Sequence, residues 1–172
     1  MVVGFKASPK GCIWEPWEES ITNSHPWTNT AWYGAPAWEL VNGQLTIEAD
    51  NPGGWQMVKY PQTWLELTLA EPFNADTMVF RVTSHCSDGP LRPQALPPLY
   101  IYEYVGARVT VTIYGKNELG ANKNKSYAIY DTADEVITVP LGFSIVTGAS
   151  VVMEIQSGTI TCAMDWLNLT QA

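Results

Sequence analysis

Two tryptophans and three charged side chains in the first half of the chain have the chemistry needed to bind a sugar. The flat face of an indole packs against the C–H face of a pyranose ring, while charged neighbours donate to or accept from its hydroxyls. Strand alternation predicts that these side chains share one sheet face, which is polar and is not the core. The predicted group is Trp55, Lys59, Trp64, Glu66 and Arg81.

Four other tryptophans lie in residues 1–37, a segment with many tryptophan and proline residues and little alternation. Strand alternation does not predict which way these indole rings point, because the segment is predicted to be largely irregular. Two of them, Trp27 and Trp32, complete the predicted ligand-binding residues. Three arrangements stay open: the segment covers the face with Trp55 and Trp64, extends it, or reaches a neighbouring subunit, where aromatic residues are favoured.

The rest of the chain predicts an all-β fold. Short β-branched and aromatic runs alternate with Gly, Pro, Asn and Asp, and no window keeps an apolar helical period for three turns. We expect one antiparallel β-sandwich or jelly-roll domain over residues 1–172, with a long N-terminal segment, long loops and little helix. The predicted strands are 38–41, 44–49, 55–60, 64–69, 77–84, 99–105, 107–114, 126–130, 135–139, 150–156 and 159–169.

The dipeptide Asn42-Gly43 is the strongest hairpin signal, because both residues tolerate the positive φ of a type I′ turn. Pairing across this turn separates the apolar side chains from the polar ones, which supports the register. Trp38 is thereby predicted to be a core residue, on one face with Leu40, Leu45 and Ile47.

Ser157-Gly158 predicts a second hairpin, between the runs 150–156 and 159–169. Its register puts the apolar side chains on the core face and Glu154 on the solvent face. Without a bulge, the second strand also carries Trp166 into the core. The residues predicted to pair in the core are Ile155 with Ile160, Met153 with Cys162, and Val151 with Met164.

A third hairpin is predicted around Val105-Gly106, between the runs 99–105 and 107–114. An even turn puts three alternating tyrosines on the core face and pairs Glu103 with Arg108 outside, whereas an odd turn reverses the faces. Two segments, 86–98 with many prolines and 116–125 with many polar residues, are predicted to be loops. The three tyrosines are Tyr100, Tyr102 and Tyr104.

Charge and hydropathy exclude several classes of partner. The formal net charge is −8 and the nine basic residues are scattered, so the basic stripe of a nucleic-acid-binding protein is missing. No apolar run approaches the roughly 18 residues of a membrane span, so membrane insertion is not expected. The first residues lack the pattern of a signal peptide, which leaves the location open between a virion and a module of an extracellular enzyme.

No group of residues carries a recognisable catalytic motif, and we do not expect an enzyme. Glu103 and Glu154 are the pair that a small jelly-roll glycoside hydrolase would need, with carboxyls about 5 Å apart. The predicted registers instead place both on solvent faces. His25 and His85 lack the sequence context of a nucleophile elbow.

Metal-binding patterns are equally weak. The three cysteines have no zinc-like spacing and are expected to be small, mostly buried hydrophobes. An acidic turn could hold a structural calcium, but a solvated turn explains it without an ion, and no cofactor is expected. The cysteines are Cys12, Cys86 and Cys162, and the acidic residues are Asp131, Asp134 and Glu135.

Three segments of the chain form a sequence pattern in succession. A short predicted hairpin (39–48) is followed by glycine and tryptophan (53–56), and the pattern closes with a strand that has an aspartate among alternating hydrophobes (151–169). In this sequence pattern the chain resembles the galactose-binding-like β-jelly-roll domains. That group includes carbohydrate-binding modules and domains appended to phage tails and capsids. The resemblance implies the fold and, by analogy, a binding role.

Two functions fit these observations. The first is a non-catalytic recognition module that binds a polysaccharide or glycan through its aromatic sheet face. The alternative is a structural or adhesion component of a phage virion, which uses residues 1–37 to contact other virion subunits or further copies of itself.

Overall fold

The computed structural model describes residues 3–8, 11–19, 28–32, 35–51, 62–96 and 101–171. Strands and their connections make up these residues, which confirms the all-β prediction. The strands are β1 (Val3–Ser8), β2 (Gly11–Glu19), β3 (Thr28–Trp32), β4 (Glu39–Val41), β5 (Gln44–Asn51), β6 (Gln62–Asn74), β7 (Thr77–Cys86), β8 (Arg92–Leu96), β9 (Ile101–Val105), β10 (Ala107–Lys116), β11 (Asn122–Ile129), β12 (Thr132–Pro140), β13 (Ile145–Ile155) and β14 (Gly158–Thr170).

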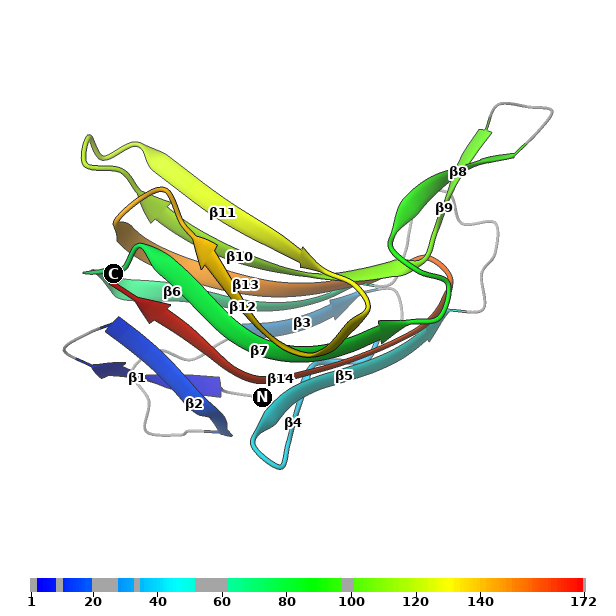
Figure 1. The fold of residues 1–172 in the computed structure, drawn as a ribbon, viewed down its shortest axis with the longest axis horizontal. Helices are drawn as coiled ribbons and strands as arrows, with labels where there is room; N and C mark the ends of the chain where they lie inside the picture. The colour runs from blue at the N-terminus through cyan, green and yellow to red at the C-terminus, as the bar shows by residue number, and fades with distance from the viewer. Residues whose placement is uncertain are drawn as a thin grey trace.

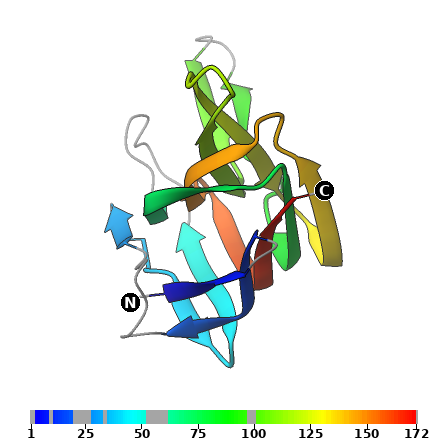
Figure 2. The ribbon, with the colours of Figure 1, turned by 90° about the vertical axis from the view of Figure 1, so that its left-hand side faces the viewer.

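Two antiparallel sheets run along the molecule and face each other (Figures 1 and 2). The five-stranded sheet has the order β11-β10-β13-β6-β3. In the seven-stranded sheet β14 is central: it pairs with β7 on one side and with β5 and β2 on the other. The remaining strands, β8 and β9, form a separate ribbon at one end.

The side chains between the sheets form one continuous hydrophobic core. Strand alternation produces it, since every second residue of the central strands points inward. Each fully buried large apolar side chain contributes roughly 1.5–3 kcal/mol to folding relative to exposure. The largest of them include Trp38, Leu65, Phe80, Met153 and Ile160, all with exposed fractions below 2%.

The Asn42-Gly43 hairpin is confirmed. Asn42 and Gly43 have φ values of 51° and 78°, and Glu39 pairs with Thr46 across the turn. Trp38 is buried, as predicted, in the core with Leu45 and Ile47.

The turn at Ser157-Gly158 differs from the prediction in what it joins. β13 and β14 belong to opposite sheets, so the turn carries the chain across the sandwich and its two strands are not paired. All six predicted core residues are nevertheless buried, because alternation along each strand is independent of the partner. Glu154 differs from the prediction only in its exposure: it lies on the outward face of its sheet, as predicted, but is buried there.

The prediction that Trp166 lies in the core is wrong. The pairing of β14 with β7 shifts between Met164 and Trp166, which marks a β-bulge. The extra residue, Asp165, reverses the alternation, so Leu167 is buried while Trp166 is partly exposed.

The third predicted hairpin is also wrong. β9 pairs with β8, whose residues lie in the segment predicted to be a proline-rich loop. Tyr104 is 52% exposed and is not a core residue; the side chains of Tyr100, Tyr102 and Glu103 lie outside the described residues. β11 likewise begins at Asn122, inside the predicted loop 116–125.

The N-terminal segment is more regular than expected. β2 pairs with β14 and β3 pairs with β6, so residues 1–37 contribute strands to both sheets. Isolated tryptophan and proline positions gave no alternation from which these pairings could be predicted.

Two buried thiols lie in this core. Cys86 and Cys162 are free, as the expectation of small buried hydrophobes implies. Desolvation raises the pKa of Cys86 to about 11 and that of Cys162 to about 12. The side chain of Cys12 lies outside the described residues.

These thiols make the folded state sensitive to alkali. The raised pKa values mean that the folded state holds both protons more tightly than the unfolded state. We therefore expect stability to be complete below the usual thiol pKa of 9.0 and to fall as the pH rises through about 11 to 12. Urea unfolding between neutral and alkaline pH checks this, and a double Cys86→Ala, Cys162→Ala variant should show a smaller alkaline loss.

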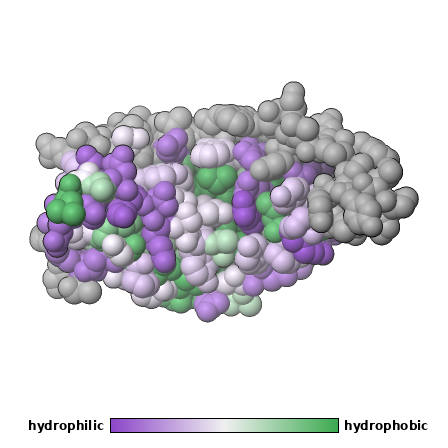
Figure 3. All heavy atoms as spheres, turned by 90° about the horizontal axis from the view of Figure 1, so that it is seen from above, coloured by the Kyte–Doolittle hydropathy of each residue, from purple (hydrophilic) through white to green (hydrophobic). Residues whose placement is uncertain are grey.

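Seen along the edge formed by β11 and β12, the described surface is mostly hydrophilic, with hydrophobic residues in separate spots (Figure 3). This is usual for a sheet edge that faces water. Within the described residues, no helix has the length and apolarity to cross a bilayer.

Candidate functional site

The outward face of the five-stranded sheet carries the candidate site. Strand register determines which side chains share it, because directly paired residues point to the same side of a sheet. Gln62 pairs with Glu154, which pairs with Arg108; one step along, Trp64 pairs with Val152. We call this surface the Trp64 face; its residues are Gln62, Trp64 and Glu66 on β6, Ser150, Val152 and Glu154 on β13, and Arg108, Thr110, Thr112 and Tyr114 on β10.

A chain of contacts crosses three strands of this face. Trp64 Nε1 donates to Gln62 Oε1 at 3.2 Å, and Gln62 Nε2 donates to Glu154 Oε1 at 3.3 Å. On the other side, Arg108 Nε donates to Glu154 Oε2 at 2.5 Å. The indole is thus tied to the Gln62 amide, and through Glu154 this contact chain reaches the Arg108 guanidinium; the amide and the guanidinium can both bond hydroxyl groups.

Further along the sheet, hydroxyl groups form pairs. The Tyr114 hydroxyl lies 3.1 Å from Ser150 Oγ, and Thr112 Oγ1 lies 2.8 Å from Ser126 Oγ. Along the central strand the outward side chains are nearly buried: Ser150 is 1% and Val152 is 9% exposed. The flanking strands carry the larger and more accessible groups, so ligand contact falls to them.

Glu154 has a positioning role on this face. Its carboxylate is almost buried and accepts from both Arg108 and Gln62, which compensates the cost of removing the charge from water. It is one of the two carboxylates considered for glycoside hydrolysis, and it lies on the outward face as expected, but it was also expected to be solvated with a single simple partner. Instead its oxygens serve to hold Gln62 and Arg108 in place.

The structure brings some of the predicted ligand-binding residues together. Trp64 is partly exposed and Glu66 is exposed, on the same face of β6, as predicted. Trp32 pairs with Gln62 in the backbone register of β3 and β6, although its side chain lies outside the described residues. Trp27, Trp55 and Lys59 also lie outside them.

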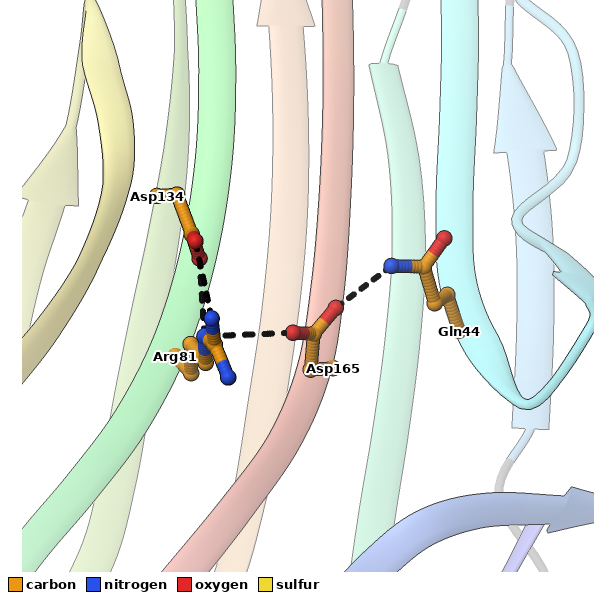
Figure 4. A network of polar contacts seen from close by, with 4 residues as sticks. All are labelled: Gln44, Arg81, Asp134 and Asp165. Carbon is orange, nitrogen blue, oxygen red and sulfur yellow. Dashed lines mark hydrogen bonds and ion pairs between the residues drawn. The ribbon is translucent and has the colours of Figure 1, made fainter.

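Arg81 was predicted to share the face with Trp64, and this is wrong. β6 and β7 follow each other in the chain but belong to opposite sheets, so Arg81 lies on the outward face of the seven-stranded sheet. There it forms a two-point ion pair with Asp134, at 2.7 and 2.8 Å, and lies 3.4 Å from Asp165 (Figure 4). Asp165 in turn accepts from Gln44.

This ion pair changes the acidity of both partners. Hydrogen bonding to Asp134 raises the pKa of Arg81, and hydrogen bonding to Arg81 lowers the pKa of Asp134. Asp134 is held in position at a bulge of β12, where its φ is 46°. Both side chains are well exposed, at 44% and 57%, so water and salt weaken the interaction.

We expect Asp134→Asn to lower the melting temperature slightly at neutral pH and low salt. Because the folded-state pKa of Asp134 is lowered, its stabilisation exists above the usual value of 3.8 and is lost as the pH falls through the lowered folded-state value. Thermal unfolding of wild type and variant should therefore converge at strongly acidic pH and in high salt. A difference that persists under both conditions would show that the ion pair is not its cause.

Two of the acidic residues considered as a calcium site, Asp131 and Asp134, form contacts with other residues of this chain. Asp131 Oδ1 accepts from the backbone N–H of Cys86 at 2.7 Å and lies 3.1 Å from His85 Nδ1, while Asp134 binds Arg81. Across the described residues, no group of three or more His, Cys, Asp or Glu side chains is placed to hold a metal ion.

Sequence reasoning did not place Gln62, Arg108 and Tyr114 in the candidate site. Arg108 was assigned to Glu103 because β9 was expected beside β10. The signal was available in alternation: Arg108, Thr110, Thr112 and Tyr114 form an unbroken polar series on a strand whose other face is fully apolar. A polar series on a central strand indicates a functional face as readily as a solvated one.

Comparison with known proteins shows the fold. No protein-family model matches the chain, and neither does any curated protein. Among solved structures, it matches the family 11 carbohydrate-binding module of a cellulosomal cellulase of Clostridium thermocellum, with a TM-score of 0.51, 9% identity, and coverage of 99% of this chain and 96% of that one.

Further matches are family 29 carbohydrate-binding modules, and two of them serve as examples. One was solved with cellulohexaose, with a TM-score of 0.44, 14% identity, and coverage of 95% of this chain and 94% of that one. The other was solved with mannohexaose, with a TM-score of 0.40, 16% identity, and coverage of 98% and 90%. Because their scores are lower, the fold assignment rests on the family 11 match. The chain has the β-jelly-roll fold of such modules, as the resemblance to galactose-binding-like domains implied.

Proposed function

We propose that this protein is a non-catalytic module that binds carbohydrate through the Trp64 face. The observation that carries the proposal is the contact chain Trp64–Gln62–Glu154–Arg108. It places a partly exposed indole in a fixed orientation beside hydrogen-bonding groups on a rigid sheet. A sugar ring needs this combination of an apolar stacking surface and adjacent polar groups.

The charge of the protein favours a neutral glycan as the ligand. The net charge is −8, and on the Trp64 face the carboxylate of Glu154 and the guanidinium of Arg108 neutralise each other. The exposed Glu66 repels polyanions. Binding to a neutral glucan or mannan should therefore depend only weakly on salt.

The jelly-roll fold shared with a carbohydrate-binding module is consistent with this function but does not by itself assign it. Among the described residues, no feature specifically favours the alternative of a virion component. The proposal is therefore confined to glycan recognition.

Isothermal titration against soluble neutral glucans and mannans, with a polyuronate as the anionic comparison, tests the proposal. We expect a Kd on the order of millimolar to micromolar for at least one neutral glycan, because few hydrogen bonds and one or two stacking rings supply the binding energy. Absence of binding to all neutral glycans would contradict the proposed function.

A further inference from the structure

The ribbon formed by β8 and β9 lies at the end of the molecule where β10 begins (Figure 1). β11 runs along the edge of β10 only as far as the pair Ile129–Val109. At the next free position of that edge, Ala107 is bridged to Pro90, at the base of the ribbon. The base of the ribbon therefore occupies the edge of β10 where β11 ends.

The base of the ribbon is fixed by several contacts. Leu91 N donates to Ala107 O at 3.0 Å, and Ala107 N donates to Gly89 O at 3.2 Å. Gly106 N donates to Ser157 Oγ at 2.9 Å, which ties the ribbon to the turn after β13. These contacts hold the base of the ribbon against the edge of β10.

A pocket of about 330 Å³ lies beside the base of the ribbon, and its lining residues are Leu91, Tyr104, Arg108 and Gln156. This volume is at the lower end of the range for small-molecule sites, about 300–1,000 Å³. Its lining combines an apolar side chain, a phenol ring that is 52% exposed, an amide and a guanidinium. Such a lining suits one neutral sugar unit.

Arg108 belongs to both the pocket and the contact chain from Trp64. From β6 across β13 to β10, that chain spans two inter-strand spacings, about 10 Å. A ligand that follows it from Trp64 past Glu154 to Arg108 next meets the pocket, and beyond the pocket the ribbon.

We propose that this pocket receives the terminal unit of a neutral glycan, so that the protein binds chain ends and not chain interiors. The proposal rests on the proposed function of the Trp64 face. Its physical basis is that a glycan crossing the sheet cannot continue past Leu91 and Tyr104 without leaving the face.

Binding stoichiometry tests the proposal, with cellulohexaose and mannohexaose as short probes and soluble glucan and mannan polymers as long ones. Chain-end binding predicts one protein per chain at every length, with a Kd per chain that does not change. Tyr104→Ala should weaken binding about tenfold for both lengths. Tyr130→Ala, which removes a tyrosine that is 36% exposed and does not line the pocket, should leave binding unchanged.

Two results would overturn the chain-end proposal: a number of bound proteins that rises with chain length, or wild-type affinity in Tyr104→Ala. Either can occur while Trp64→Ala still weakens binding at least about tenfold, in which case the proposed function stands and only the end pocket fails. If none of these glycans binds, or if Trp64→Ala binds them as the wild type does, the proposed function itself fails.

Discussion

Replacement of Trp64 with alanine is expected to weaken glycan binding at least about tenfold while the protein remains folded. Loss of the indole removes a stacking surface worth about 1.4 kcal/mol or more, which corresponds to a factor of ten. It also removes the donor that Gln62 Oε1 accepts from, so the amide is no longer held in place. Because Trp64 is partly exposed on an outward face, its loss should cost little stability.

Titration calorimetry with one neutral glycan, alongside thermal unfolding, measures both effects. Trp166→Ala is the matched control, because Trp166 is also partly exposed but belongs to the opposite sheet. It should bind as the wild type does. Trp64→Phe keeps an aromatic ring and should lose less affinity than Trp64→Ala. Unchanged binding in Trp64→Ala together with loss of binding in Trp166→Ala would contradict the prediction, because it would place the site on the seven-stranded sheet.

Gly106→Ala is expected to lower the free energy of unfolding by about 3 kcal/mol. Gly106 has a φ of +84°, which costs a residue with a Cβ roughly 1 kcal/mol. A Cβ there would also lie 2.4 Å from Gly89 O and 2.6 Å from Pro90 O, both backbone atoms at the base of the ribbon. Relieving such overlap costs a further 1–3 kcal/mol or so.

Gly120→Ala separates these two causes. Gly120 has a similar φ of +78°, but a Cβ there would meet nothing within 4 Å. Urea unfolding should therefore show a loss of only about 1 kcal/mol for Gly120→Ala. Equal losses in the two variants would mean that the close approach of the ribbon to Gly106 does not contribute.

The sequence predicted the elements of this fold better than their pairing. Alternation within a strand is local, so the buried positions of Trp38, Met153 and Ile160 followed from it directly. The turn at Ser157-Gly158 shows why alternation does not predict pairing. A hairpin and a crossing between sheets would place the same residues inward, so the burial pattern does not distinguish them.

The errors at the candidate site have the same origin. Arg81 was assigned to the Trp64 face because consecutive strands usually pair, whereas β6 and β7 lie in opposite sheets. Arg108 was missed because its partner, Glu154, lies 46 residues away in the chain. The prediction for Trp166 was wrong because of one bulge residue, Asp165, and nothing in the local sequence predicts that bulge.

Glu154 also shows why burial of polar groups escapes sequence reasoning. A glutamate in a strand is usually solvated, and it becomes a buried residue only when partners supply hydrogen bonds. Those partners come from β6 and β10, on either side of β13. Only the completed sheet brings the three strands together.

The most direct test of the central claim is to locate the bound glycan by two-dimensional NMR of the ¹⁵N-labelled protein during titration with a neutral glucan or mannan. We predict that the indole N–H signal of Trp64 and the side-chain amide signals of Gln62 shift with the same Kd, whereas the side-chain amide signals of Gln44 on the opposite sheet do not move. Shifts confined to the face of the seven-stranded sheet, around Gln44 and Arg81, would contradict the account.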